Sequence, residues 1–188
     1  MSRSSPRDAV LSATVRCAGR VGIARITVEE VAREASVARA TVYRWFPGGR
    51  EQLVDEAATW EIGRFLARLG AAVEDAPDFP TRLEQGLVFA HRAIEEHEVL
   101  QRLLETEPGG LLPQLQATTP MVVAVIRDYL VPFLEAEDLR RGVDPVEAAD
   151  HLARMILSFI GGPGSWDLDD PAEVHALVRD RFLAGILA

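Results

Sequence analysis

Apolar and small side chains recur at three- and four-residue steps along most of this chain of 188 residues. Such spacing places them on one face of an α-helix, whereas a half-buried strand alternates apolar and polar residues. No stretch alternates in that way, and glycine and proline gather between the periodic segments. The pattern predicts an all-α fold of about nine helices, over residues 7–21, 28–35, 39–46, 50–74, 81–96, 99–106, 118–135, 145–160 and 172–187.

Glycine and proline also predict the main interruptions. The sequence EPGGLLP at residues 107–113 predicts a loop, and GGPGSWDLDDP at residues 161–171 predicts the longest irregular stretch. Pro132 lacks an amide hydrogen and clashes with the carbonyl four residues earlier, that of Asp128. We therefore expect the helix over residues 118–135 to kink or end at Pro132.

Charge is unevenly divided along the chain, whose net charge is −9. Residues 1–50 contain nine arginines and four acidic residues, a balance of +5, whereas the remainder contains 11 arginines and 25 acidic residues, a balance of −14. A basic segment on an acidic chain indicates that this segment meets a polyanion such as nucleic acid.

Other features argue against several classes of protein. The single cysteine, Cys17, allows no internal disulfide and fits a reducing compartment. We find no signal peptide and no run of about 18 apolar residues, so we expect a cytoplasmic protein without a membrane partner. The four histidines lack metal spacing, GGPG lacks the Lys-Ser/Thr of a phosphate loop, and Ser158 lacks a nucleophile-elbow context. We expect no enzyme activity, no metal and no cofactor.

Residues 27–46 predict two short helices joined by a tight turn. Thr27 and Glu30 have the spacing of a capping box, and Ile26 and Val31 that of a hydrophobic staple. On a helical wheel for residues 38–46, one arc holds Arg39, Ala40, Tyr43 and Arg44, and the opposite side holds Ala38, Val42 and Phe46. This helix–turn–helix would bury its apolar side and present two guanidinium groups to guanine edges and phosphates.

Residues 10–54 resemble the N-terminal DNA-binding domain of the tetracycline-repressor (TetR) family of bacterial transcription regulators. The resemblance is carried by Thr27, Val31, Ala32, Ala35, Val37, Thr41, Tyr43 and Phe46. Two residues depart from the family pattern: Ser36 replaces the turn glycine, and Ala38 replaces the serine that caps the recognition helix. Each change can cost about 1 kcal/mol.

The resemblance implies a DNA-binding domain over residues 1–49 and a ligand-sensing and dimerisation domain over residues 50–188. We expect Arg39 and Arg44 to read bases, with Ala40 allowing close approach of the backbone and Trp45 at the flank. Thr27, Thr41, Tyr43 and Arg50 would contact phosphates. The expected function is a homodimeric repressor that a small hydrophobic effector releases from operator DNA. The alternative is a helical protein-binding adaptor with a degenerate helix–turn–helix.

The two strongly apolar helices near the C-terminus admit two interpretations. They form a core helix and its cover within one subunit, or they also pair with their copies in a homodimer. For the dimer, the interface residues would be Leu152, Ile156, Phe159, Leu177 and Phe182. An effector pocket beside Pro132 would be lined by Trp60, Phe65, Phe89, Arg92, Met121, Tyr129, Phe133, His151, Met155 and Phe159. The alternative is that these residues are ordinary core, since apolar side chains at helical spacing do not define a ligand site by themselves.

Overall fold

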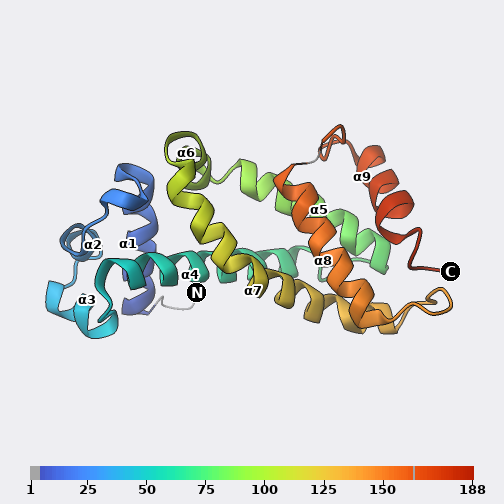
Figure 1. The fold of residues 1–188 in the computed structure, drawn as a ribbon, viewed down its shortest axis with the longest axis horizontal. Helices are drawn as coiled ribbons and strands as arrows, with labels where there is room; N and C mark the ends of the chain where they lie inside the picture. The colour runs from blue at the N-terminus through green and yellow to red at the C-terminus, as the bar shows by residue number, and fades with distance from the viewer. Residues whose placement is uncertain (1–4, 163) are drawn as a thin grey trace. The chain divides into compact units, whose positions relative to one another are not determined.

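The computed structural model describes residues 5–162 and 164–188, so Pro163 of the predicted irregular stretch lies outside the described residues. Within these ranges the chain forms nine α-helices and no strand (Figure 1), which confirms the all-α expectation. The helices are α1 (Pro6–Val21), α2 (Val28–Glu34), α3 (Arg39–Trp45), α4 (Gly49–Ala72), α5 (Phe79–Glu95), α6 (Glu98–Thr106), α7 (Pro108–Glu135), α8 (Pro145–Gly161) and α9 (Pro171–Leu177).

The chain folds into two compact units that do not follow the order of the sequence. The first comprises the residues up to Phe65 together with Ile94–Thr118, and the second comprises Leu66–Ala93 together with Thr119–Ala188. The N-terminal helices therefore share a unit with α6 and the start of α7. The predicted functional division at residues 49 and 50 does not coincide with this structural division, and it stays a prediction.

The core of the first unit brings α6 directly onto α1. A Cβ atom on Gly19 would lie 2.8 Å from Cγ2 of Val99, so the glycine allows the two helices to approach closely. Thr14 is the buried polar residue here, and its hydroxyl donates to the carbonyl of Val10 at 2.9 Å. The fully enclosed side chains of this core include Val10, Ala13, Cys17, Val31, Val42, Phe46 and Leu53.

The core of the second unit is built mainly from α5, α7, α8 and α9. After α9, the chain continues as a π-helical segment over Val178–Leu183, where a regular helix to residue 187 was predicted. Arg140 holds the C-terminal residues in place, because its Nε donates to the carbonyl of Leu187 at 2.9 Å. The most enclosed side chains are Leu87, Leu134, Leu152, Leu168, Leu177 and Val178.

Helix α7 corrects the expected loop and limits the expectation for Pro132. It begins at Pro108, inside the predicted loop of residues 107–113, and it does not end at Pro132 but continues to Glu135, so the kink at Pro132 stays a prediction. A proline in the first turn removes an amide that has no partner in any helix. The later prolines, Pro113, Pro120 and Pro132, are all on the exposed side, where water can solvate the carbonyls they leave without an amide.

The same helix bears on the expectation about membranes. By length and composition α7 could cross a bilayer, with a mean hydropathy of 1.3 over 18 residues, whereas the sequence analysis expected no such run. The helix is longer than predicted because the expected loop at residues 107–113 is helical, but Gln116, Arg127 and Asp128 interrupt its apolar residues. A single helix of this kind is weak support for a membrane protein, since core helices of soluble proteins meet the same criterion.

Candidate nucleic-acid interface

Helix α2 begins with the predicted capping box. The Thr27 hydroxyl accepts a hydrogen bond from the Glu30 amide at 3.2 Å, and Oε2 of Glu30 accepts one from the Thr27 amide at 3.2 Å. Ile26 and Val31, the predicted staple, are both buried in the core of the first unit. These contacts fix where α2 starts.

The turn between α2 and α3 places a serine in a left-handed conformation. Ser36 has φ of +55°, and its amide donates to the carbonyl of Arg33 at 3.1 Å. The next amide, of Val37, donates to the carbonyl of Ala32 at 3.0 Å. This pair of bonds is the Schellman arrangement, which favours glycine at the position of Ser36. The sequence departs from the family pattern at a position where positive φ is required.

Helix α3 has the two faces that the helical wheel predicts. Val42 and Phe46 have no exposed surface, and they anchor the helix in the core of the first unit. On the outward side Arg39, Ala40 and Arg44 are exposed, and Tyr43 is 40% exposed. Thr41 is half-buried at the flank of this surface, which we call the α3 arc: Arg39, Ala40, Tyr43 and Arg44. Ala38 is exposed, so its predicted inward position is wrong.

Arg39 is held by two neighbours. Its Nη1 forms an ion pair with Oε1 of Glu29 in the first turn of α2, and its Nη2 donates to the Tyr43 hydroxyl at 3.4 Å. The guanidinium also lies over the Tyr43 ring, 5.3 Å from its centre. The hydrogen bond to Tyr43, followed by the charge of Glu29, raises the pKa of Arg39.

Arg44 and Trp45 lie side by side at the end of α3. The Arg44 guanidinium is 5.8 Å from the centre of the Trp45 ring. Trp45 is half-buried and packs against the core of the first unit. No carboxylate among the described residues is paired with Arg44, which leaves its charge available to a partner.

Arg50 does not lie on the α3 arc, although the sequence predicted a phosphate contact for it. Its Nη2 donates to the carbonyl of Ile23 at 2.7 Å, and its Nε is buried without a hydrogen-bond partner among the described residues. Ile23 lies in the short 3-10 segment Ile23–Arg25, which the sequence analysis did not predict. A phosphate would have to compete with this contact, and the phosphate role of Arg50 stays a prediction.

Helix α3 begins without a side-chain cap, which gives a testable prediction. Ala38 has the extended conformation of an N-cap residue, with φ of −68° and ψ of 141°, but no side chain bonds the first amides. A serine there could accept from the Thr41 amide, so Ala38→Ser should stabilise the protein by about 1 kcal/mol. Urea unfolding measures this change. The matched variant Ala40→Ser, inside the helix, should give no gain, and equal effects of the two would contradict the capping explanation.

The residues predicted to line an effector pocket are divided between the units. Trp60 and Phe65 belong to the first unit, and the other eight belong to the second. Arg92 and His151 are exposed, and Arg92 Nε donates to Asp169 at 2.9 Å. Met121 is also exposed, Phe89 is half-buried, and Met155 and Phe159 pack against the core of the second unit. The pocket stays a prediction.

A cationic side chain that the sequence analysis missed contacts two of these residues. The Arg82 guanidinium lies 4.4 Å from the centre of the Phe133 ring, and its Nη1 donates to the Tyr129 hydroxyl at 3.1 Å. The rings of Tyr129 and Phe133 are 5.2 Å apart. No local pattern could have revealed this contact, because Arg82 precedes Tyr129 by 47 residues.

The predicted dimer interface is corrected at three positions. Leu152 and Leu177 have no exposed surface and Phe182 has 2%, since all three fill the core of the second unit. Side chains enclosed in their own subunit cannot contact a second copy. Ile156 and Phe159 are partly exposed, and Phe159 packs edge-on against Phe182 at 5.3 Å. For the three enclosed residues, the structure agrees with the alternative of a core helix and its cover.

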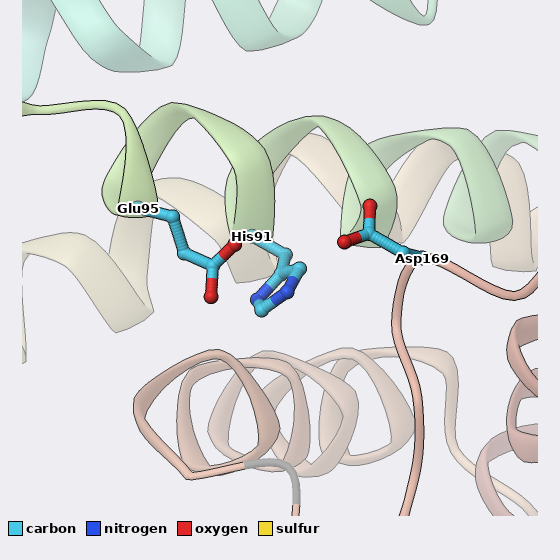
Figure 2. Close-up of side chains that lie close together, drawn as sticks. All are labelled: His91, Glu95 and Asp169. Carbon is cyan, nitrogen blue, oxygen red and sulfur yellow. The ribbon is translucent and has the colours of Figure 1, made fainter.

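One group of polar side chains was not foreseen. Figure 2 shows His91 on α5, one turn before Glu95, and Asp169 in the segment that precedes α9. Potential metal-binding atoms of His91 and Asp169 lie within 4.8 Å of each other. Asp169 already accepts a hydrogen bond from Arg92, and exposed acidic groups often gather without an ion. We assign no metal role to these residues.

Comparison with known proteins supports the helix–turn–helix assignment. Residues 10–57 match the family described as bacterial regulatory proteins, tetR family. Among curated proteins, no sequence matches this chain. Solved structures share the fold: the fatty acid degradation regulator FadR from Bacillus halodurans is 17% identical, with a TM-score of 0.63 over 95% of this chain and 96% of its own.

Two repressors are similar in the same way. The TetR family repressor AlkX from Dietzia sp. strain DQ12-45-1b is 21% identical, with a TM-score of 0.58 over 98% of this chain and 97% of its own. SmeT, the repressor of the Stenotrophomonas maltophilia multidrug efflux pump SmeDEF, is 22% identical, with a TM-score of 0.61 over 98% and 92%.

A helical fold with an exposed cationic arc on the second helix of a helix–turn–helix defines a DNA-binding transcriptional regulator. The match over residues 10–57 and the shared fold support the assignment of this chain to the TetR-family transcriptional regulators.

Proposed function

We propose that this protein is a cytoplasmic, homodimeric repressor that binds operator DNA through α3 and is released by a small hydrophobic effector. The observation that carries the proposal is the α3 arc, in which Arg39, Tyr43 and Arg44 project from a helix anchored by Val42 and Phe46. An arginine at this place can form two hydrogen bonds with a guanine edge in the major groove, and tyrosine hydroxyls commonly bond phosphates. The protein acts by binding rather than by catalysis.

Dimerisation follows from the geometry of such recognition. One helix–turn–helix reaches one half-site, whereas two reach half-sites about 34–36 Å apart or a multiple of that distance. The exposed parts of α8 and of the segment after α9 are the proposed interface, with Ile156 and Phe159 at its edge. Sedimentation of the free protein tests this part of the proposal, because a monomer at micromolar concentration would contradict it.

The effector part of the proposal rests on the apolar character of the second unit. SmeT has also been solved in complex with triclosan, an example of a similar fold that binds a small molecule. An effector acts only through its different affinity for the DNA-binding and released conformations. We propose that it binds among the aromatic side chains of the second unit, including Phe133 and Phe159, and lowers operator affinity by at least about tenfold at saturation.

Arg44→Ala tests the base-reading role. Loss of a bidentate contact should weaken operator binding by about 1–3 kcal/mol and relax preference at one base position in each half-site. Fluorescence anisotropy with operator variants measures both effects. Arg33→Ala, an exposed arginine outside the α3 arc, is the control for lost charge. If Arg44→Ala weakens binding to every sequence equally, Arg44 contacts phosphate and reads no base.

The operator itself can be found by footprinting the DNA upstream of the protein's own gene. A regulator should protect a stretch with two symmetric halves, and its affinity should fall steeply as salt rises. A helical adaptor that binds other proteins would show no saturable binding to this DNA at any salt concentration.

A further inference from the structure

The two arginines of the α3 arc are in unlike electrostatic surroundings. Arg39 is paired with Glu29, and the side chains of the two residues are 58% and 54% exposed. Arg44 contacts the Trp45 ring and no carboxylate among the described residues. On the surface proposed to approach DNA, Arg39 therefore has a negative charge beside it, whereas Arg44 does not.

The position of Glu29 is set by the backbone of α2. It lies in the first turn, one residue before Glu30, whose carboxylate is engaged in the capping box with Thr27. The two acidic residues of this turn therefore have different partners: Glu30 bonds the Thr27 amide in the cap, and Glu29 pairs with Arg39 of α3. Since an acid in the first turn is also favourable to the helix dipole, Glu29 is compatible with a stable α2.

For stability alone, the Glu29–Arg39 pair contributes little, because exposed ion pairs are weak. For DNA recognition it has two consequences. It restrains the Arg39 side chain, together with Tyr43, so less rotamer freedom is lost when Arg39 contacts a base. The pair also places the Glu29 carboxylate on the surface proposed to face DNA. This carboxylate repels DNA phosphates, so a DNA contact forms there only if its other interactions outweigh the repulsion.

Both consequences increase the difference between the affinity for the operator and the affinity for other DNA. On non-specific DNA, Arg39 would serve as one more phosphate contact, and its pairing with Glu29 weakens that contact. At the operator, a base edge accepts hydrogen bonds from the Arg39 guanidinium while Glu29 and Tyr43 hold that side chain in place. We propose that Glu29 is a specificity-determining residue, which positions Arg39 and suppresses its use as a non-specific phosphate contact. This inference rests on the proposed function of α3.

The test is Glu29→Gln, measured on the footprinted operator and on an unrelated duplex of equal length at several salt concentrations. Affinity for the unrelated duplex should rise about threefold to tenfold, and operator affinity should change less, so the ratio between them falls. The dependence of log affinity on log salt should steepen by roughly 0.9 on the unrelated duplex, as expected for one additional phosphate contact.

A matched variant separates position from charge. Glu105→Gln removes the same charge from an exposed residue of α6 in the same unit. It should change both affinities by the same small factor. If Glu105→Gln lowers the ratio as much as Glu29→Gln, the effect is one of net charge and the inference is wrong.

A double-mutant cycle identifies Arg39 as the residue through which Glu29 acts. In the Arg39→Ala background, Glu29→Gln should leave the affinity ratio unchanged. A fall in the ratio that persists without Arg39 would overturn the inference, while base reading by Arg44 would stand. If the wild-type protein shows no preference for any upstream DNA, the proposed function itself fails. Thermal melting by circular dichroism confirms that each variant is folded.

Discussion

Replacing Gly22 by alanine should lower the free energy of unfolding by about 1–3 kcal/mol. Gly22 has φ of +88° and ψ of 154°, a region that is essentially open to glycine only. A Cβ atom there would also lie 2.1 Å from Oε1 of Glu107, at the junction of α6 and α7. The backbone strain is the main cost, and the Glu107 carboxylate must in addition move away from the new methyl group.

Urea unfolding of three variants tests this explanation. Gly22→Ala combined with Glu107→Ala should recover part of the loss, because the clash is removed and the strained backbone remains. Gly63→Ala in α4, where no other group lies within 4 Å, should instead stabilise by up to about 1 kcal/mol. A Gly22→Ala protein as stable as the wild type would show that this close approach does not exist.

Arg82→Ala should destabilise the second unit by about 2–4 kcal/mol. The guanidinium donates to carbonyls just beyond the end of α4: those of Val73, of Glu74 at 3.3 Å and of Ala76 at 3.5 Å. It also bonds the Tyr129 hydroxyl and covers the Phe133 ring of α7. Its removal leaves half-buried carbonyls without a donor and separates the end of α4 from α7.

The planar shape of the Arg82 guanidinium contributes to stability as well as its charge. Arg82→Lys keeps the charge but lacks the fork of donors, so it should restore less than half of the loss. Arg92→Ala removes an exposed arginine of the same helix, paired with Asp169, and should cost less than about 1 kcal/mol. Equal losses for Arg82→Ala and Arg92→Ala in urea unfolding would refute the role given to Arg82.

Local signals in the sequence predicted much of the fold. The helices before α7, together with α8, begin and end within two residues of their predicted positions, because caps, glycines and apolar periodicity act over a few residues. The start of α7 was missed because proline and glycine favour loops, although a proline in the first turn suits a helix equally well. The helical wheel predicted the α3 arc correctly, since exposure on a short helix follows from its period.

Features that depend on packing between helices were not predictable in this way. Leu152 and Leu177 are buried because other helices of the same chain pack on them. The apolar pattern of a helix does not reveal whether its apolar face packs against the same chain or against a second copy. The pairing of Glu29 with Arg39 joins two helices across the turn that contains Ser36. Likewise, the inward contact of Arg50 depends on the carbonyl of Ile23, in a segment without a sequence signature.

The central claim is that α3 reads bases in the major groove, and methylation interference tests it most directly. Methylation of guanine N7 places a methyl group on an acceptor that arginine uses. We predict that such methylation in two patches about one helical turn apart, or a multiple of that, blocks binding of the wild-type protein to its upstream DNA. In Arg44→Ala, the interference at one guanine of each patch should disappear. Saturable binding that is insensitive to N7 methylation throughout the site would contradict the claim.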